Sequence, residues 1–259
     1  MGAGAHGRVR RGGRAPSWRS KGAVLGALVS CANAPMHPCA AQAPRYDAAQ
    51  FACTIFDVRV RTSVTTELQG QRRVEELRRD GRLTVRGTPG DSGIAMVAWW
   101  DTLSLWRRAD GVTLAPDAEG LLGGRYRGSL MPDGRFIRIA APWVPDEVAE
   151  VSDLTVALDD LLPVFSAGTF RRLADSGGRK RFRLATATDV DAPATAERPF
   201  AVHESESSDG VVTWGREGVL SWVRQITVVT RVAEAPGRAF RSELVQKIEL
   251  RRVGGCPGR

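Results

Sequence analysis

The residues best suited to chemistry gather in the segment VHESESSDG, where His203 stands close to Glu204, Glu206 and Asp209. Such a group raises two possibilities, a metal site and a Ser/His/acid nucleophile system. In a strand, however, His203 and Glu204 point to opposite faces, so they cannot bind one ion together. A polar strand that ends at an Asp-Gly turn explains the same residues. We therefore predict neither a metal site nor a catalytic centre here.

A second motif, GDSG at residues 90–93, has the letters that flank the nucleophile of chymotrypsin-like serine proteases. His6 and His37 are the histidines upstream, of which only His37 could remain in a mature exported chain, and no segment similar to TAAHC is present. A turn between two strands accounts for the glycines and the proline of GTPGDSG. The segment GLLGG at residues 120–124 lacks the lysine of a phosphate-binding loop. The sequence thus predicts a protein that is not an enzyme and uses no metal and no cofactor.

The first 43 residues have the composition of a bacterial export leader. Six basic residues and no acid precede residue 22, and a short apolar run, 23–29, follows them before a stretch of small residues. This order is typical of a signal peptide, and the run is too short to cross a bilayer, which takes about 20 apolar residues. A disordered basic tail that binds nucleic acid is the alternative, but such a tail needs no apolar block.

Two cleavage sites compete at the end of this leader. Leu28-Val29-Ser30-Cys31 resembles a lipobox, which predicts lipidation of Cys31 and a membrane anchor. Ala41-Gln42-Ala43 fits ordinary signal peptidase and predicts a mature chain that starts at Pro44. Both sites predict export to the periplasm or the outer membrane, and both leave one β-rich domain over residues 44–259.

Removal of the leader changes the charge of the protein. The whole chain has 37 Lys and Arg against 29 Asp and Glu, and six of the basic residues precede residue 31. The mature chain therefore has 31 basic residues against 29 acidic ones, close to neutrality. A general affinity for nucleic acid loses its main support, and we predict no nucleic-acid partner.

Cysteines at the two ends of the domain agree with export. Cys53 lies in the first predicted strand and Cys256 just after the last. First and last strands of a sheet can be neighbours, so an oxidising compartment allows a Cys53–Cys256 disulfide. Two unpaired thiols are the alternative, and cleavage at Cys31 adds Cys39 as an odd cysteine.

Alternation of apolar and polar residues is the strongest structural signal. Even positions from Phe56 to Leu68 are Phe, Val, Thr or Leu, and the odd positions between them are charged or hydroxyl residues. The segments 220–232 and 240–250 alternate in the same way around a turn at 233–239. This pattern predicts long antiparallel strands with one face on a core and the other in water, the last two forming a hairpin.

Further strands are predicted in the middle of the chain. Segment 72–87 is expected to be a hairpin that turns at Asp80-Gly81, and segment 124–139 a hairpin that turns at Pro132-Asp133-Gly134. Segment 94–108 is apolar on both faces, which indicates a central or doubly covered strand. Segments 180–188 and 202–214 add two or three more.

One segment changes the period. Apolar residues recur every three or four positions from Val148 to Leu162, after Pro145, Asp146 and Glu147 and before Pro163. We predict one helix, or two short ones, over residues 146–162. The predicted fold class is α+β and mainly β: a large, curved antiparallel sheet, or half-barrel, with the helix packed on its concave face.

This order of leader, long strands, central helix and closing hairpin resembles the LolA/LolB-like half-barrel proteins of the bacterial envelope. The segments YRGSLMPDGRFIRI, LDDLLPVFSAGTF and LSWVRQITVVTRV are also similar to uncharacterised exported proteins of environmental bacteria. The half-barrel resemblance implies a lipid or a lipidated protein as ligand. It assigns no functional residue of that family to a position of this chain.

Six tryptophans in residues 44–259 offer material for an apolar pocket, although core packing is the ordinary role of tryptophan. We predict a non-catalytic envelope protein that binds a lipid-like or peptide-like ligand. The alternative is a structural or interaction protein of the envelope without a small ligand. The predicted lining residues are the wall residues of the closing hairpin, a central tryptophan and a helix residue: Trp222, Ile226, Leu244, Trp100 and Leu158.

Overall fold

The fold is described from a computed structural model, which places residues 42–115, 117–142, 161–166, 169–195, 200–233 and 239–256. Residues from Ala41 onward form one compact unit. Most of the predicted leader, with Cys31, and most of the predicted helix, with Leu158, lie outside the described residues.

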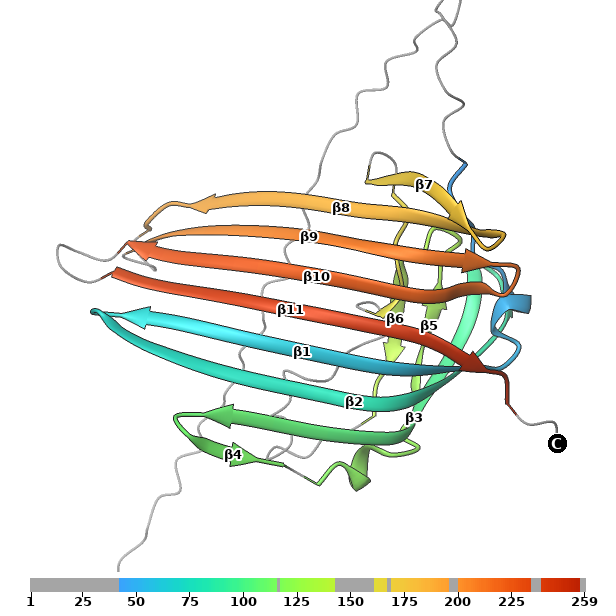
Figure 1. Ribbon diagram of the computed structural model, residues 1–259, viewed down its shortest axis with the longest axis horizontal. Helices are drawn as coiled ribbons and strands as arrows, with labels where there is room; N and C mark the ends of the chain where they lie inside the picture. Colours follow the sequence, from blue (N-terminus) through green and yellow to red (C-terminus); the bar gives the residue numbers. More distant parts are fainter. Residues whose placement is uncertain are drawn as a thin grey trace, which may run out of the picture. The chain divides into compact units, whose positions relative to one another are not determined.

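One large antiparallel sheet of eleven strands makes up the described part of the chain (Figure 1). Two short 3-10 turns, η1 (Ala48–Phe51) and η2 (Glu119–Leu121), accompany it. The strands are β1 (Thr54–Leu68), β2 (Gln71–Gly90), β3 (Gly93–Ala109), β4 (Val112–Leu114), β5 (Tyr126–Leu130), β6 (Phe136–Ala140), β7 (Phe170–Ser176), β8 (Arg179–Ala192), β9 (Ala201–Gly215), β10 (Gly218–Ala233) and β11 (Ala239–Gly254). The mainly β fold class and the curved antiparallel sheet are as predicted.

The first and last strands pair in the middle of the sheet. The strand order is β6-β5-β3-β2-β1-β11-β10-β9-β8-β7, and β4 pairs with β3. Strands β1 to β3 and β7 to β11 each follow their chain neighbours, whereas the consecutive strands β6 and β7 lie at opposite edges of the sheet. The junction of β1 with β11 joins the two halves of the chain. The disulfide between Cys53 and Cys256 lies at this junction, with 5.5 Å between the two Cα atoms.

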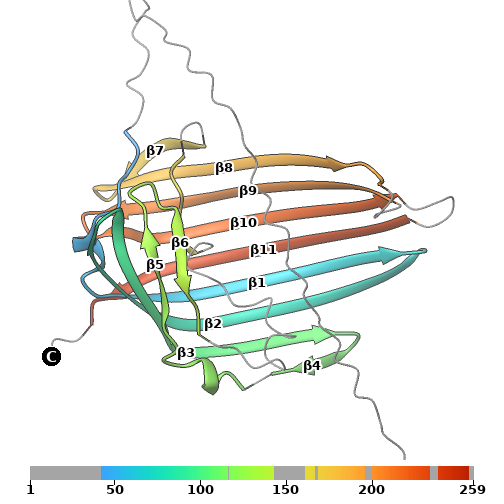
Figure 2. The same ribbon diagram turned by 180° about the vertical axis from the view of Figure 1, so that it is seen from behind.

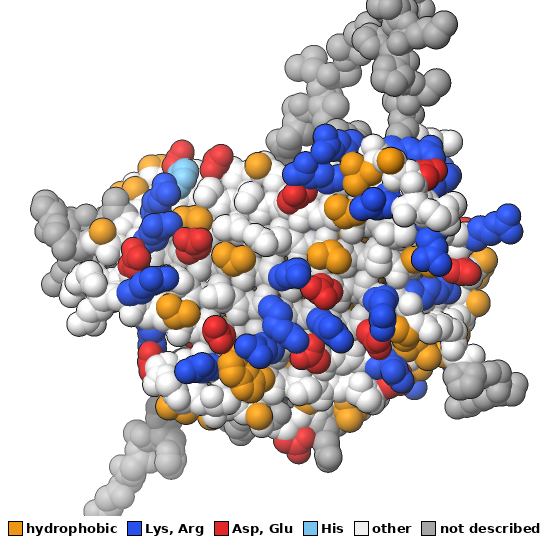
Figure 3. Space-filling view, viewed as in Figure 1, with side chains coloured by type: hydrophobic (Ala, Val, Ile, Leu, Met, Phe, Trp, Pro, Cys, Tyr) orange, Lys and Arg blue, Asp and Glu red, His pale blue; other side chains and the backbone are white. Residues whose placement is uncertain are grey.

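The alternation of apolar and polar residues in the sequence corresponds to the two faces of the sheet. Phe56, Val58 and Val60 of β1 are buried on the inner face. The outer face carries charged side chains of both signs (Figure 3), such as the pairs Arg61–Asp80 and Lys247–Glu249. Solvated ion pairs of this kind add little stability each, but they keep the outer face soluble.

Two predicted Asp-Gly turns are wrong. β2 runs straight through Asp80-Gly81, and β9 runs straight through Asp209-Gly210. Each glycine instead makes room for a tryptophan: a Cβ atom at Gly81 would lie 2.9 Å from the Trp100 ring. Glycine in a strand interior allows another group to approach the backbone closely, and here that group is an aromatic ring.

Two other predicted turns are present. Segment 124–139 is the β5–β6 hairpin, where the Gly134 amide donates to the carbonyl of Met131 at 2.9 Å. Segment 87–93 is the turn between β2 and β3, with Gly90 opposite Gly93. The closing hairpin consists of β10 and β11 in continuous antiparallel register.

The hydrophobic core fills one half of the inner face. There β5 and β6 turn over the sheet (Figure 2) and pack with η1 and residues 161–165 against its inner face. Tyr46 joins the layers, since its ring lies 4.9 Å from the Trp214 ring and its hydroxyl donates to the Pro163 carbonyl at 2.9 Å. Phe165 packs edge-on against Phe182 and Trp214. Of the predicted helix, the structure describes only the last two residues, Leu161 and Leu162, which are buried in this core.

Candidate functional site

The inner face continues beyond the core, and we call this continuation the trough. It consists of the inner-face residues that follow the buried pair Val60–Ile248 toward the far ends of four adjacent strands. They are Thr62, Val64, Thr66 and Leu68 of β1, Phe240, Ser242, Leu244 and Gln246 of β11, Ile226, Val228, Thr230 and Val232 of β10, and Val202, Glu204, Glu206 and Ser208 of β9.

Apolar residues of the trough form rows across the strands. Val64, Leu244 and Val228 are direct cross-strand partners, and all three are half-buried. A second apolar row joins Leu68, Phe240, Val232 and Val202. Hydroxyl residues, such as Thr66, separate the two rows. Six residues of a strand cover about 20 Å, so the trough is long enough for an extended hydrocarbon chain.

A cavity of about 230 Å³ lies where the core ends and the trough begins. Both apolar and polar side chains line it. The Arg224 guanidinium donates from Nε to the hydroxyl of Ser208 at 2.7 Å, which fixes one wall. The lining residues are Leu162, Pro163, Val164, Ser166, Thr169, Leu184, Ala185, Thr186, Ser208, Trp222 and Arg224.

Trp222 belongs to the core and also borders this cavity. Its side chain is only 3 % exposed, and it packs among the buried apolar residues of the core. Within the described ranges, the indole Nε1 is buried and has no hydrogen-bond acceptor. A buried donor without a partner costs free energy.

The other predicted lining residues lie in different places. Ile226 and Leu244 lie in the trough on the same face as Trp222. Trp100 is buried in the core on β3, at the other side of β1 and β2, so it does not face the trough. Leu158 lies outside the described residues.

Charged residues flank the trough on the side of β2 and β3. Glu75 and Arg107 form an ion pair at 2.5 Å with about one quarter of each side chain exposed. Arg73 forms a second pair with Asp110. Nearer the core, Arg79 is 1 % exposed on the inner face. Its charge acts on Tyr126, whose pKa is nevertheless raised because burial disfavours the phenolate.

Sequence reasoning missed this charged flank. In RRVEELRR, the residues Arg73, Glu75, Leu77 and Arg79 occupy alternate positions, as residues on one face of a strand do. The predicted hairpin at Asp80-Gly81, however, gave this segment a different pairing from the one it has with β1. The register of β2 against β1 is what brings Arg73, Glu75 and Arg79 to the inner face.

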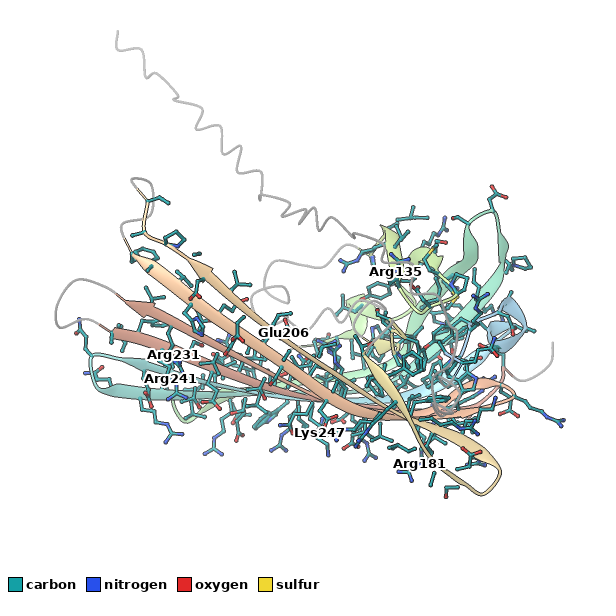
Figure 4. The ribbon with its side chains drawn as sticks, turned by 90° about the horizontal axis from the view of Figure 1, so that it is seen from above. Arg135, Arg181, Glu206, Arg231, Arg241 and Lys247 are labelled. Carbon is teal, nitrogen blue, oxygen red and sulfur yellow. A yellow bond between two sulfur atoms is a disulfide. The ribbon has the colours of Figure 1, made fainter. Side chains whose placement is uncertain are left out.

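The acidic segment around His203 is divided between the two faces of β9. His203 lies on the outer face, where its Nδ1 is 2.8 Å from a carboxylate oxygen of Asp191. Glu204 and Glu206 lie on the inner face, and Figure 4 shows Glu206 on the opposite side of the sheet from Lys247. In the part of the chain that the structure describes, no group of three His, Cys, Asp or Glu residues is placed to hold a metal ion. Nor does that part include a helix that is long and apolar enough to cross a membrane.

No protein-family model matches this chain, and no curated protein matches it. A solved structure described by lipid–protein interactions in lipovitellin is similar at 8 % identity over 84 % of this chain, with a TM-score of 0.41. This chain spans only 26 % of lipovitellin. The S-type phycobiliprotein lyase CPES from Guillardia theta is similar at 8 % identity over 76 % of this chain and 88 % of its own, with a TM-score of 0.18. At these TM-scores neither likeness bears on function, and the resemblance to LolA/LolB half-barrels stays a prediction.

Proposed function

We propose that this protein binds an elongated, lipid-like ligand along the trough and catalyses no reaction. The observation that carries the proposal is the continuation of apolar rows on the inner face beyond the end of the core. Residues such as Val64, Leu244 and Val228 are half-buried there. Single apolar residues are normal on a surface, but here Val64, Leu244 and Val228 are direct partners on three adjacent strands and make a contiguous apolar row.

The surroundings of the trough favour an amphipathic ligand over a purely apolar one. Hydroxyl residues separate the apolar rows, and the pairs Glu75–Arg107 and Arg73–Asp110 line the β2–β3 side. Ligand sites are typically apolar with a few polar groups that fix the orientation of the ligand. A fatty acid or a lipid, with an apolar chain and a polar end, has this composition.

Export to the bacterial envelope completes the proposal. The basic and apolar order of the first 43 residues supports it. The disulfide Cys53–Cys256 supports it as well, because disulfides persist in oxidising compartments. Lipidation of Cys31 would hold the domain at a membrane surface, where lipid-like ligands are available.

A matched pair of variants tests the proposal. Leu244 and Val245 are neighbours on β11, both half-buried, but Leu244 faces the trough and Val245 faces outward. We would titrate a fluorescent fatty acid into the parent protein, Leu244→Arg and Val245→Arg. Loss of the Leu244 contact alone is worth about 1.5–3 kcal/mol, so the affinity of Leu244→Arg should fall about tenfold or more. Val245→Arg should bind as the parent does.

Two results would contradict the proposal. Absence of probe binding by the parent would leave the alternative, an interaction protein that docks a partner without a small ligand. Equal losses of affinity in both variants would place the ligand somewhere other than the trough. Circular dichroism of each variant, compared with the parent, checks that the sheet is intact.

A further inference from the structure

A basic groove lies on the outer face, at the end of the sheet that covers the core. It has a volume of about 730 Å³ and crosses the ends of β8, β9, β10 and β11. Four arginines and one acidic residue are among its lining residues, and we call it the arginine groove. The full lining is Ser176, Arg179, Arg181, Thr213, Glu217, Leu220, Ser221, Arg251, Arg252, Gly254 and Gly255.

The register of the sheet sets two of these arginines on either side of two hydroxyl groups. Arg181 pairs with Thr213, Thr213 with Ser221, and Ser221 with Arg251, so the four residues form one transverse row. Neighbouring strands are about 4.8 Å apart, which puts the two arginine backbones about 14 Å apart. Long side chains that lean inward from both ends can reach one small group above Thr213 and Ser221.

Positive charge in the groove exceeds what its acids neutralise. Among the described residues, Arg179 and Arg181 form no ion pair, and Arg251 meets only Asp57, at 3.3 Å through an exposed side chain. Figure 3 shows Lys and Arg side chains gathered over this end of the β7–β8 region. Glu217 is the single acid of the lining.

Arg252 is one of the lining residues, and hydrogen bonds hold its guanidinium in place. Its Nη1 donates to the backbone carbonyls of Gln50 and Glu217. Partial burial lowers the pKa of its guanidinium, but an arginine remains charged at physiological pH. Neutral carbonyl oxygens hold this group in place without cancelling its charge.

We propose that the arginine groove binds a phosphoryl group, either as a free phosphate ester or as the headgroup of a lipid. Guanidinium groups match the oxygens of phosphate in pairs, and hydroxyl groups add neutral donors beside them. The site is separate from the trough, since it lies on the opposite face of the sheet. It does not depend on the proposed binding of an apolar ligand.

The experiment compares two double variants of equal charge change. Arg181→Gln with Arg251→Gln removes the two ends of the row. Arg231→Gln with Arg241→Gln removes a directly paired couple at the other end of the same outer face, and Figure 4 shows Arg181 and the Arg231–Arg241 couple toward opposite ends of the sheet. Calorimetry with pyrophosphate measures the free ligand. Sedimentation with phosphatidylcholine vesicles that contain phosphatidylglycerol measures the headgroup.

The variant Arg181→Gln with Arg251→Gln should lose about tenfold or more in affinity, because each removed contact is a charge-assisted hydrogen bond. The control, Arg231→Gln with Arg241→Gln, should stay within about twofold of the parent. That result with pyrophosphate assigns a soluble phosphate, and the same result with vesicles alone assigns a lipid headgroup. Equal behaviour of the two variants would overturn the proposal, and so would absence of binding to both probes by the parent. Arg252 is left unchanged in both variants because its hydrogen bonds hold the surrounding backbone.

Discussion

The ring of Trp222 on β10 lies directly over Gly210 on β9, so close that a Cβ atom at Gly210 would be 2.6 Å from the ring carbon Cη2. Trp100 lies over Gly81 in the same way at the other side of the sheet. In both cases the glycine follows an aspartate in the middle of a long strand. These two pairs let large aromatic rings lie flat on the inner face where the core meets the sheet.

Replacement of Gly210 by alanine should destabilise the fold. The new methyl group would collide with the Trp222 ring and would lie 2.6 Å from the Val223 carbonyl. Overpacking of this kind costs about 1–3 kcal/mol, measured as a shift of the urea midpoint. Gly254→Ala is the control, because a Cβ atom there meets nothing within 4 Å. Similar midpoints for the two variants would show that the ring can move aside.

Replacement of Trp222 by alanine should cost about 3–5 kcal/mol, as for a buried core tryptophan. The side chain is only 3 % exposed and packs in the core, although it also borders the cavity. Trp99→Ala should cost less, about 1 kcal/mol, because that ring packs on the outer side under Arg125 at 3.9 Å. Chemical denaturation of both variants gives the comparison, and the opposite order of costs would be inconsistent with this packing.

The two tyrosines should resist ionisation until the protein unfolds. Burial raises the pKa of Tyr46 well above its ordinary value near 10, and it raises the pKa of Tyr126 as well. A raised folded-state pKa stabilises the fold below pH 10 and loses that contribution as the pH rises further. Alkaline titration should therefore show tyrosinate absorbance only together with loss of the fold. An early, reversible tyrosinate signal from folded protein would contradict this.

A Tyr46→Phe variant separates two contributions of this residue. At neutral pH it should be less stable by about 1 kcal/mol, because the hydrogen bond to the Pro163 carbonyl is lost. Above pH 10 the difference should shrink, since phenylalanine has no proton to lose. Denaturant midpoints of parent and variant at neutral and alkaline pH measure both effects.

The disulfide should stabilise the fold strongly. It joins residues 203 positions apart, and a loop of that length corresponds to about 5 kcal/mol in the chain-entropy treatment. The double variant Cys53→Ser with Cys256→Ser should unfold at lower denaturant concentration and should no longer respond to reductant. Alkylation of both Cys53 and Cys256 in the folded parent protein, read by peptide mass spectrometry, would contradict the pairing.

Much of the sheet could be predicted from the sequence because alternation is a local property. The strand at Phe56–Leu68, the closing hairpin and the turn at Pro132-Asp133-Gly134 all follow from patterns within about 15 residues. Asp80-Gly81 and Asp209-Gly210 could not be interpreted in this way. Whether such a pair turns or continues depends on the tryptophan of a neighbouring strand, which pairing alone brings into contact.

Candidate sites were harder to predict for the same reason. Alternation correctly puts Ile226 and Leu244 on one face. Where the core stops on that face, however, depends on how far β5, β6 and Phe165 cover it. The arginine groove needs the register of four strands at once, since Arg181 and Arg251 are 70 positions apart in sequence. No periodicity within one segment indicates such a row.

The position of a bound ligand on the sheet tests the central claim most directly. We would add a fatty acid that carries a nitroxide and record methyl NMR spectra, in which the nitroxide broadens the signals of nearby groups. The account predicts broadening of the trough residues Val64, Val228 and Leu244, with little change at the outer-face residues Val223, Val229 and Val245. Equal broadening on both faces, or broadening confined to the outer face, would contradict it.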